Sequence, residues 1–91
     1  MRKIDSKFHI ENDEIIKTSN NSVVSKDEPL FLVRARDYLA LNLLRYYAKI
    51  SGADSCNDYH MHGLSKTIEE FEEFKIKNPE KMKQPGVTRG L

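Results

Sequence analysis

The chain has 91 residues, with 15 Lys and Arg against 14 Asp and Glu, so its formal net charge is +1. So small an excess argues against duplex nucleic acid as a partner, and no apolar run approaches the roughly 18 residues that a membrane span needs. Cys56 is the only cysteine, which excludes an intrachain disulfide and a four-cysteine zinc site, and the start "MRKIDSKFHI" lacks the apolar stretch of a secretory signal. These features favour a cytoplasmic protein with a single domain over residues 1–91, whose small core self-association would support.

The charges are distributed unevenly along the chain. Residues 34–49 carry four basic side chains and one acidic, residues 50–73 one basic and six acidic, and residues 74–91 five basic and one acidic. Two basic segments therefore flank an acidic one. This pattern predicts a local basic pocket and an acidic helix face in a chain that is nearly neutral as a whole.

The first third of the sequence is typical of short strands. "KFHI" (7–10) alternates apolar and polar residues, the polar turn "END" follows, and "EIIKT" (14–18) predicts the second strand of a hairpin. Asn20 and Asn21 suit left-handed turn geometry, and Pro29 does not fit a central strand. The apolar run "LFLVRA" (30–35) predicts the strongest strand, buried on both faces, so that strands extend over about 7–35.

Two helices are predicted after the strands. The first covers about 38–51, with Asp37 as its N-cap. The second covers about 56–77, with Ser55 as a weak cap and with its end set by Pro79. A C-terminal loop over 78–91 completes the chain, so the fold class is α+β: a short N-terminal hairpin or small antiparallel sheet, two α-helices and an irregular tail.

The first predicted helix is apolar over more than one face. The stripe expected to face the sheet consists of Leu39, Leu43, Tyr46 or Tyr47, and Ile50. Tyr38, Leu41 and Leu44 extend the apolar surface around the helix, which predicts a subunit interface. In the second helix the stripe expected to face the core consists of Met61, Leu64, Ile68, Phe71, and Phe74 or Lys75.

Cys56 and His60 are four residues apart, a spacing that on a helix places a thiol beside an imidazole. This pair is a candidate nucleophile and base. The simpler interpretation is a small thiol and a hydrogen-bonded histidine, because no third group that would orient them can be placed. The pair could also be half of a metal site, but His60 and His62 point to different sides of a helix and cannot share an ion. No metal and no cofactor are expected. A polar contact from His60 to a ligand is the favoured role.

Arg34 and Arg36 lie where the chain passes from the predicted strand to the first helix. Their planar guanidinium groups suit phosphate or carboxylate ligands. The alternative is a surface ion pair with Asp37 or Glu28, which would contribute little to stability.

The chain ends "EKMKQPGVTRGL" (80–91), which combines lysines with a Pro-Gly turn, Thr88 and Arg89. Amides after such a turn can point together at an anion, and Lys83, the threonine hydroxyl and the guanidinium would add to the site. A frayed end is the alternative. The segment contains no known phosphate-binding loop motif, so its composition alone favours an anion site.

Three segments carry a resemblance to other proteins: "DEPLFLVRARDYLALNLLRYYA", "CNDYH" and "KMKQPGVTRG". They resemble segments of small proteins encoded by bacteriophages and prophages, over about residues 27–90. The resemblance implies a viral origin and an accessory role inside an infected bacterium. Small phage proteins of this size are often counter-defence factors, and one type is an oligomeric sponge that traps a nucleotide signal of bacterial immunity.

Three functions from different classes remain. The favoured one is the binding and sequestration of an anionic nucleotide signal, a cyclic oligonucleotide or an ADP-ribose derivative, by a homo-oligomer in the bacterial cytoplasm. The residues expected to contact this ligand are Arg34, Arg36, Tyr47, Tyr59, His60, Lys83, Thr88 and Arg89. The first alternative is an inhibitor that docks on a host defence protein through tyrosines and the acidic segment 69–73. The second is a small phosphodiesterase or hydrolase that uses His60, with Cys56 or His9.

Overall fold

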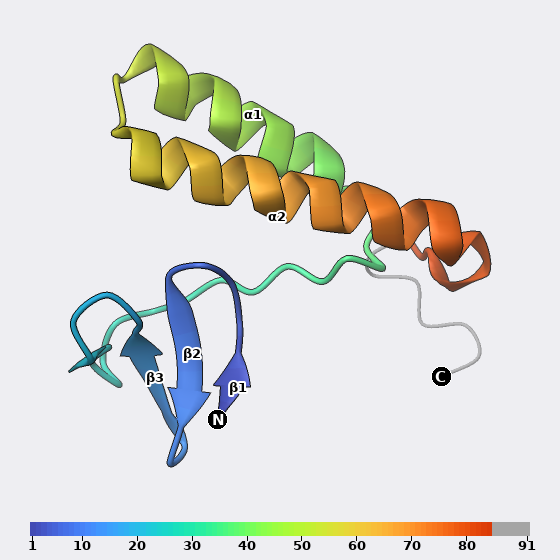
Figure 1. Cartoon of the computed structure of the whole chain (residues 1–91). Coiled ribbons are helices and arrows are strands. Elements are labelled where there is room, and N and C mark those ends of the chain that lie inside the picture. The colour runs from blue at the N-terminus through green and yellow to red at the C-terminus, as the bar shows by residue number, and fades with distance from the viewer. Residues whose placement is uncertain (85–91) are drawn as a thin grey trace. The chain divides into compact units, whose positions relative to one another are not determined.

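A computed structural model describes residues 1–84 of the chain, and residues 85–91 lie outside the described part. A four-stranded antiparallel sheet is followed by two helices (Figure 1), so the α+β prediction is confirmed. The chain forms two compact units, Met1–Phe31 and a second unit that begins at Leu32.

The first unit is a meander of four short strands. These are β1 (Arg2–Lys3), β2 (Phe8–Glu11), β3 (Glu14–Lys17) and β4 (Ser22–Val23), and each pairs with the next along the chain. Between β2 and β3, Asn12 and Asp13 have φ angles of 52° and 62°. Positive φ at both central residues defines the type I′ turn that fits the twist of a tight hairpin. The predicted hairpin is therefore confirmed.

The centre of the sheet is formed by a histidine and an isoleucine on paired strands. His9 on β2 lies opposite Ile16 on β3, and both side chains are buried. His9 Nδ1 lies 2.9 Å from Thr18 Oγ1, and His9 Nε2 lies 3.3 Å from the Glu11 carboxylate. Since a carboxylate only accepts, Nε2 donates to Glu11. These contacts give His9 a structural role within the sheet.

The strand predicted over 30–35 does not form, and that prediction was wrong. Leu30, Phe31 and Leu32 are 58 %, 84 % and 75 % exposed and belong to no strand. An apolar run becomes a strand only where another strand satisfies its backbone groups. The sheet ends at β4, and the boundary between the two units falls inside this run.

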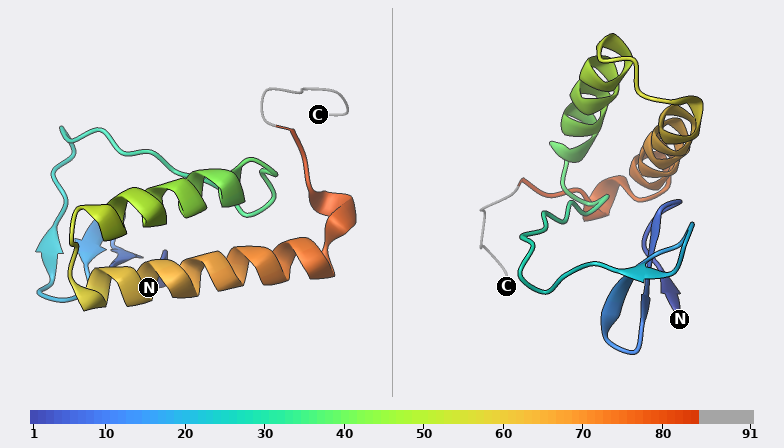
Figure 2. Two further views of the ribbon diagram at one scale, coloured as in Figure 1. Left: turned by 90° about the horizontal axis from the view of Figure 1, so that it is seen from above. Right: turned by 90° about the vertical axis from the view of Figure 1, so that its left-hand side faces the viewer.

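The second unit is a pair of helices joined by a short turn. Helix α1 covers Ala40–Ala53, α2 covers Asp58–Lys77, and the 3₁₀ turn η1 covers Pro79–Lys81. The two views in Figure 2 show α1 and α2 side by side with opposite directions. A connection this short makes consecutive helices antiparallel neighbours. Among the described residues, no helix is both long and apolar enough to cross a membrane.

Both helices begin two residues later than the sequence predicts, because other residues cap them. The Asp37 carboxylate accepts from the Leu39 amide at 2.9 Å in a turn before α1, so Leu39 and not Asp37 is the N-cap. At α2, the Asn57 side chain accepts from the His60 amide at 2.8 Å and replaces Ser55 as the predicted cap. Ser55 instead has a φ of 58° in the turn between the helices. A polar side chain caps a helix only where its own backbone is extended, as at Asn57.

The predicted choice of buried face on α1 was also wrong. The least exposed positions of α1 follow one face at helical spacing: Ala40, Leu41, Leu44, Ala48 and Ser51. Small residues on this face let a neighbouring helix approach closely. The stripe that was expected to be buried, Leu39, Leu43, Tyr46, Tyr47 and Ile50, is 44 % to 62 % exposed. The core stripe of α2 agrees with the prediction, since Leu64 is buried and Met61, Ile68, Phe71 and Phe74 are half-buried.

Candidate anion-binding site

The structure brings two basic segments together through their backbones. Asp37 and Lys83 form an isolated parallel bridge. The Lys83 amide donates to the Arg36 carbonyl at 2.8 Å, and the Tyr38 amide donates to the Lys83 carbonyl at 3.1 Å. Arg36 and Lys83, which are far apart in the sequence, therefore lie on adjacent stretches of chain at the start of α1.

Local structure explains why these segments meet. A turn in which the Asp37 amide donates to the Arg34 carbonyl at 3.0 Å leads the chain into α1. At the other end, Asn78 stops α2, with its side-chain amide donating to the Phe74 carbonyl at 3.1 Å. Pro79 then starts η1, which turns the chain back towards the beginning of α1. The length of α2 and its stop at Asn78 thus position Lys83.

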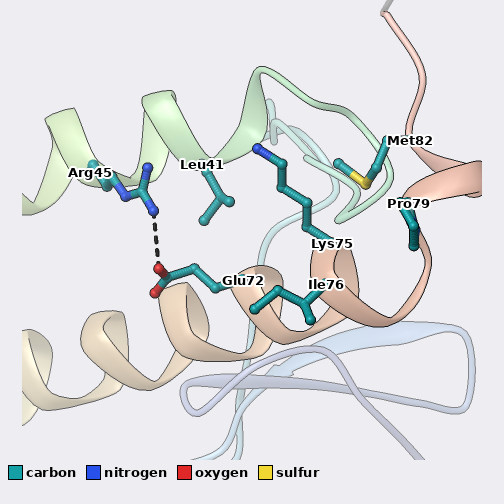
Figure 3. A pocket seen from close by; sticks show the side chains of 7 residues that line it. All are labelled: Leu41, Arg45, Glu72, Lys75, Ile76, Pro79 and Met82. Carbon is teal, nitrogen blue, oxygen red and sulfur yellow. Dashed lines mark hydrogen bonds and ion pairs between the residues drawn. The ribbon is translucent and has the colours of Figure 1, made fainter.

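An open groove of about 540 Å³ lies beside this junction. Its lining comes from the start of α1, the end of α2 and the turn that follows: Leu41, Arg45, Glu72, Lys75, Ile76, Pro79 and Met82. Figure 3 shows the Lys75 side chain reaching from α2 towards α1, beside Leu41. The walls are mostly apolar, so a ligand in the groove would meet hydrocarbon on its sides and charge at its edges.

The charge around the groove is predominantly positive. Arg45 donates to Glu72 at 3.1 Å across the two helices, which neutralises both groups. Within residues 1–84, none of Arg34, Arg36, Lys75 and Lys83 is in an ion pair. Unpaired cations close to one another repel, and an anionic ligand between them would relieve that repulsion.

The remaining predicted ligand residues lie elsewhere or outside the described residues. His60 and Tyr47 meet near the turn between the helices, where their rings are 5.6 Å apart and nearly perpendicular, and Tyr59 is exposed beside them. Counted along α1 from Ala40 at about 1.5 Å per residue, Tyr47 lies about 10 Å and Ser51, which contacts His60, about 16 Å from the basic junction. Thr88 and Arg89 lie outside the described residues. One chain therefore holds Arg34, Arg36 and Lys83 before the start of α1, and Tyr47, Tyr59 and His60 further along the helix pair.

The geometry near His60 does not resemble a catalytic site. Its Nε2 lies 3.3 Å from Ser51 Oγ, but Ser51 is only 4 % exposed and so is closed to a substrate. Cys56 is exposed and precedes α2, so the helical spacing that predicted a shared face with His60 does not apply. Residues 1–84 contain no cluster of three or more His, Cys, Asp or Glu side chains that could hold a metal ion. The contacts of His60 are those of a residue that joins two helices.

Sequence reasoning missed several residues that the structure places at these two ends. Arg45, Lys75 and Met82 line the groove, and Ser51 holds His60. For Ser51 a signal was present in the short turn predicted between the helices. In an antiparallel pair, residues equally distant from the turn lie opposite each other, as Ser51 and His60 do.

The chain matches no protein family, no curated protein and no solved structure. Its function is therefore argued from the site alone.

Proposed function

We propose that the protein binds a phosphate-bearing small molecule and holds it without changing it. The ligand class that fits best is a nucleotide immune signal, either a cyclic oligonucleotide or an ADP-ribose derivative. The protein would then act in the bacterial cytoplasm as a phage-encoded counter-defence factor. This role requires tight binding and no chemistry.

The observation that carries the proposal is the backbone pairing of Arg36 with Lys83. It places two cationic side chains on adjacent stretches of chain, and among the described residues neither forms an ion pair, although Asp37 is the bridge partner of Lys83. Lys75 adds a third cationic group in the neighbouring groove. Guanidinium and ammonium groups so arranged suit the charged oxygens of a phosphate, and the apolar groove walls suit a sugar or base.

Binding is favoured over catalysis because neither candidate catalytic pair is accessible and oriented. The hydroxyl beside His60 is buried, and Cys56 lies before the helix that carries His60. Nucleophilic catalysis needs a reacting group that a substrate can reach and a base that is itself held in place. The site offers cationic side chains and an apolar groove, which are sufficient to bind and sequester a ligand.

A second candidate function is the inhibition of a host defence protein by direct docking. The exposed stripe of Leu39, Leu43, Tyr46, Tyr47 and Ile50 on α1 favours it, because exposed tyrosines and leucines are common at protein interfaces. Mimicry of nucleic acid by the acidic segment is less well supported. Glu72 is paired with Arg45 and Glu73 with Lys77, which leaves less negative charge than the sequence suggests.

The test is capture and release of the ligand. The purified protein is incubated with cyclic di- and oligoadenylates and with ADP-ribose derivatives, washed by gel filtration and denatured by heat. A sponge retains at least one of these compounds through the column and returns it intact. Return of a cleaved product would show an enzyme, and retention of no compound would contradict the proposal.

A further inference from the structure

The groove between α1 and α2 is lined by one carboxylate, which the binding of an anion alone does not explain. Glu72 Oε2 accepts from Arg45 Nη2 at 3.1 Å. Its other oxygen, Oε1, has no hydrogen-bond partner within residues 1–84. No buried side-chain oxygen in that part of the chain lacks a partner, so Oε1 is open to solvent. The groove therefore presents an acceptor that the protein itself does not use.

The charged groups of the groove follow one another in a fixed order. Figure 3 shows the pair of Arg45 and Glu72 at one end and Met82 at the other, with Lys75 between them. Lys75 follows Glu72 by three residues on α2, so their Cβ atoms are about 5–6 Å apart. Met82 directly precedes Lys83 and the basic junction. A ligand along the groove would meet a carboxylate first and then cationic groups.

We infer that the groove takes a ribose 5′-phosphate whose 2′- and 3′-hydroxyls are both free. The inference deepens the proposed function and rests on it. Glu72 Oε1 accepts from the two hydroxyls, and Lys75 faces the phosphate. A carboxylate repels a phosphate but accepts from neutral hydroxyls, and Asp or Glu holds ribose hydroxyls in this way in dinucleotide-binding folds. The hydroxyls and the 5′-phosphate lie on opposite sides of one sugar ring, a separation that suits neighbouring positions on a helix.

This assignment separates the two ligand classes of the proposed function. In ADP-ribose the adenosine is joined through its 5′ oxygen and keeps both hydroxyls. In a 3′,5′-linked cyclic oligonucleotide the 3′ oxygen belongs to the phosphodiester, so each ribose has one hydroxyl to donate. A carboxylate oxygen can accept from both hydroxyls of the first ligand and from one of the second. The site therefore favours an ADP-ribose derivative with a free cis-diol.

The alternative place for the phosphate is the Arg45 guanidinium. A phosphate there would have to displace Glu72, whose carboxylate already holds Arg45 at 3.1 Å. The two arrangements predict opposite effects of removing the Glu72 charge. If Glu72 holds the sugar, its removal weakens the binding of a nucleotide with a diol, whereas if it competes for Arg45, its removal strengthens that binding.

The test compares ADP with 2′-deoxy-ADP by isothermal titration into the full chain at low salt. The two nucleotides have the same charge and differ by one hydroxyl, so the comparison isolates the contact with the diol. The wild type is expected to bind ADP about tenfold more tightly, because it loses a charge-assisted hydrogen bond with the deoxy compound. In Glu72→Gln the difference is expected to disappear. This variant keeps the size of the side chain and removes an exposed ion pair, which contributes little to stability.

Glu70→Gln is the matched control, since Glu70 is an exposed residue of α2 that does not line the groove. It should keep the preference of the wild type for ADP. The inference is overturned if the wild type binds both nucleotides equally or binds neither, and if its preference survives in Glu72→Gln. Tighter binding of ADP by Glu72→Gln would place the phosphate at Arg45 and overturn it as well.

Failure of this inference is distinguishable from failure of the proposed function. A wild type that retains a cyclic oligoadenylate more tightly than ADP-ribose would contradict the role of Glu72 and leave the proposed function standing. A wild type that retains no phosphate compound would contradict both.

Discussion

Ser51 and His60 show how one polar contact joins the two helices at the scale of single residues. The Ser51 hydroxyl is buried within hydrogen-bonding distance of the His60 ring, and the edge of that ring meets Tyr47. A buried hydrogen bond of this kind contributes about 1 kcal/mol to the free energy of unfolding.

The contribution of this hydrogen bond to stability can be measured by replacing Ser51 with alanine and correcting for the change in helix propensity. Alanine favours a helix more than serine does, so Ser65→Ala, on the exposed side of α2, serves as the control. We expect Ser51→Ala to be less stable than Ser65→Ala by about 1 kcal/mol in urea unfolding. Equal stability of the two variants would mean that the contact with His60 adds nothing.

Glu73 and Lys77 give a residue-scale prediction of pH dependence. The hydrogen bond and the charge of Lys77 lower the pKa of the Glu73 carboxyl below its ordinary value. The pair therefore stabilises α2 at pH values above the ordinary pKa of glutamate, and this contribution is lost as the pH falls through the lowered pKa.

NMR titration of the Glu73 carboxyl carbon checks this prediction. In Lys77→Gln the pKa of Glu73 should rise towards its ordinary value, because both the hydrogen bond and the charge are removed. Lys66→Gln removes a charge from the same helix without removing either member of the pair, and it should leave the pKa of Glu73 unchanged. An unchanged pKa in Lys77→Gln would show that the two side chains do not meet in solution.

The β2–β3 hairpin is the element that the sequence specifies best. Alternating residues in 7–10 and 14–18 predicted two strands, and the polar residues between them fitted a tight turn. Asp13 holds a φ of 62°, a conformation that glycine adopts at less cost than any residue with a Cβ.

Substitutions at Asp13 test the type I′ turn. Asp13→Gly should stabilise the hairpin by about 0.5–1 kcal/mol, and Asp13→Val should destabilise it by more, because a β-branched residue resists positive φ. Hydrogen exchange of the His9 and Ile16 amides is the measurement, because in this register they belong to a hydrogen-bonded pair between β2 and β3, as Lys7 and Thr18 do. Asp27→Gly is the control, since Asp27 has no positive φ and glycine there brings no gain. If Asp13→Gly lowered the protection of both amides, the turn would be of another type.

The positions of the two helices could be predicted from the sequence, but the face of α1 that is buried could not. Periodic apolar residues and Pro79 located both of them, because these signals are local. Periodicity shows which residues share a face but not which neighbour covers that face. On α1 the large residues Leu39 and Leu43 were taken for the core, whereas α2 packs on the side that carries the small residues Ala40 and Ala48. The run 30–35 failed for a similar reason, since its apolar character does not show which strand will pair with it, and within residues 1–84 it pairs with none.

At the scale of the whole molecule, the candidate site depends on a contact between distant parts of the chain. The sequence showed that the segments around Arg36 and Lys83 are both basic. It did not show that they would be adjacent, because this depends on where α2 ends and how η1 turns the chain back to α1. Tyr47 and His60 were assigned to the same site from residue type alone, whereas the structure places their ring contact further along the helix pair, away from the basic junction.

The central claim is that the side chains of Arg36 and Lys83 hold an anionic ligand, and isothermal titration tests it most directly. The ligand is the cyclic adenylate or ADP-ribose derivative that the wild type retains, measured at low and at high salt. We expect the affinity of the wild type to fall as salt rises, and Arg36→Glu and Lys83→Glu each to weaken binding at least about tenfold, a loss of roughly 1.4 kcal/mol. Lys66→Glu, the same charge change on an exposed part of α2, should bind as the wild type does. Equal affinity of all four proteins would contradict the account.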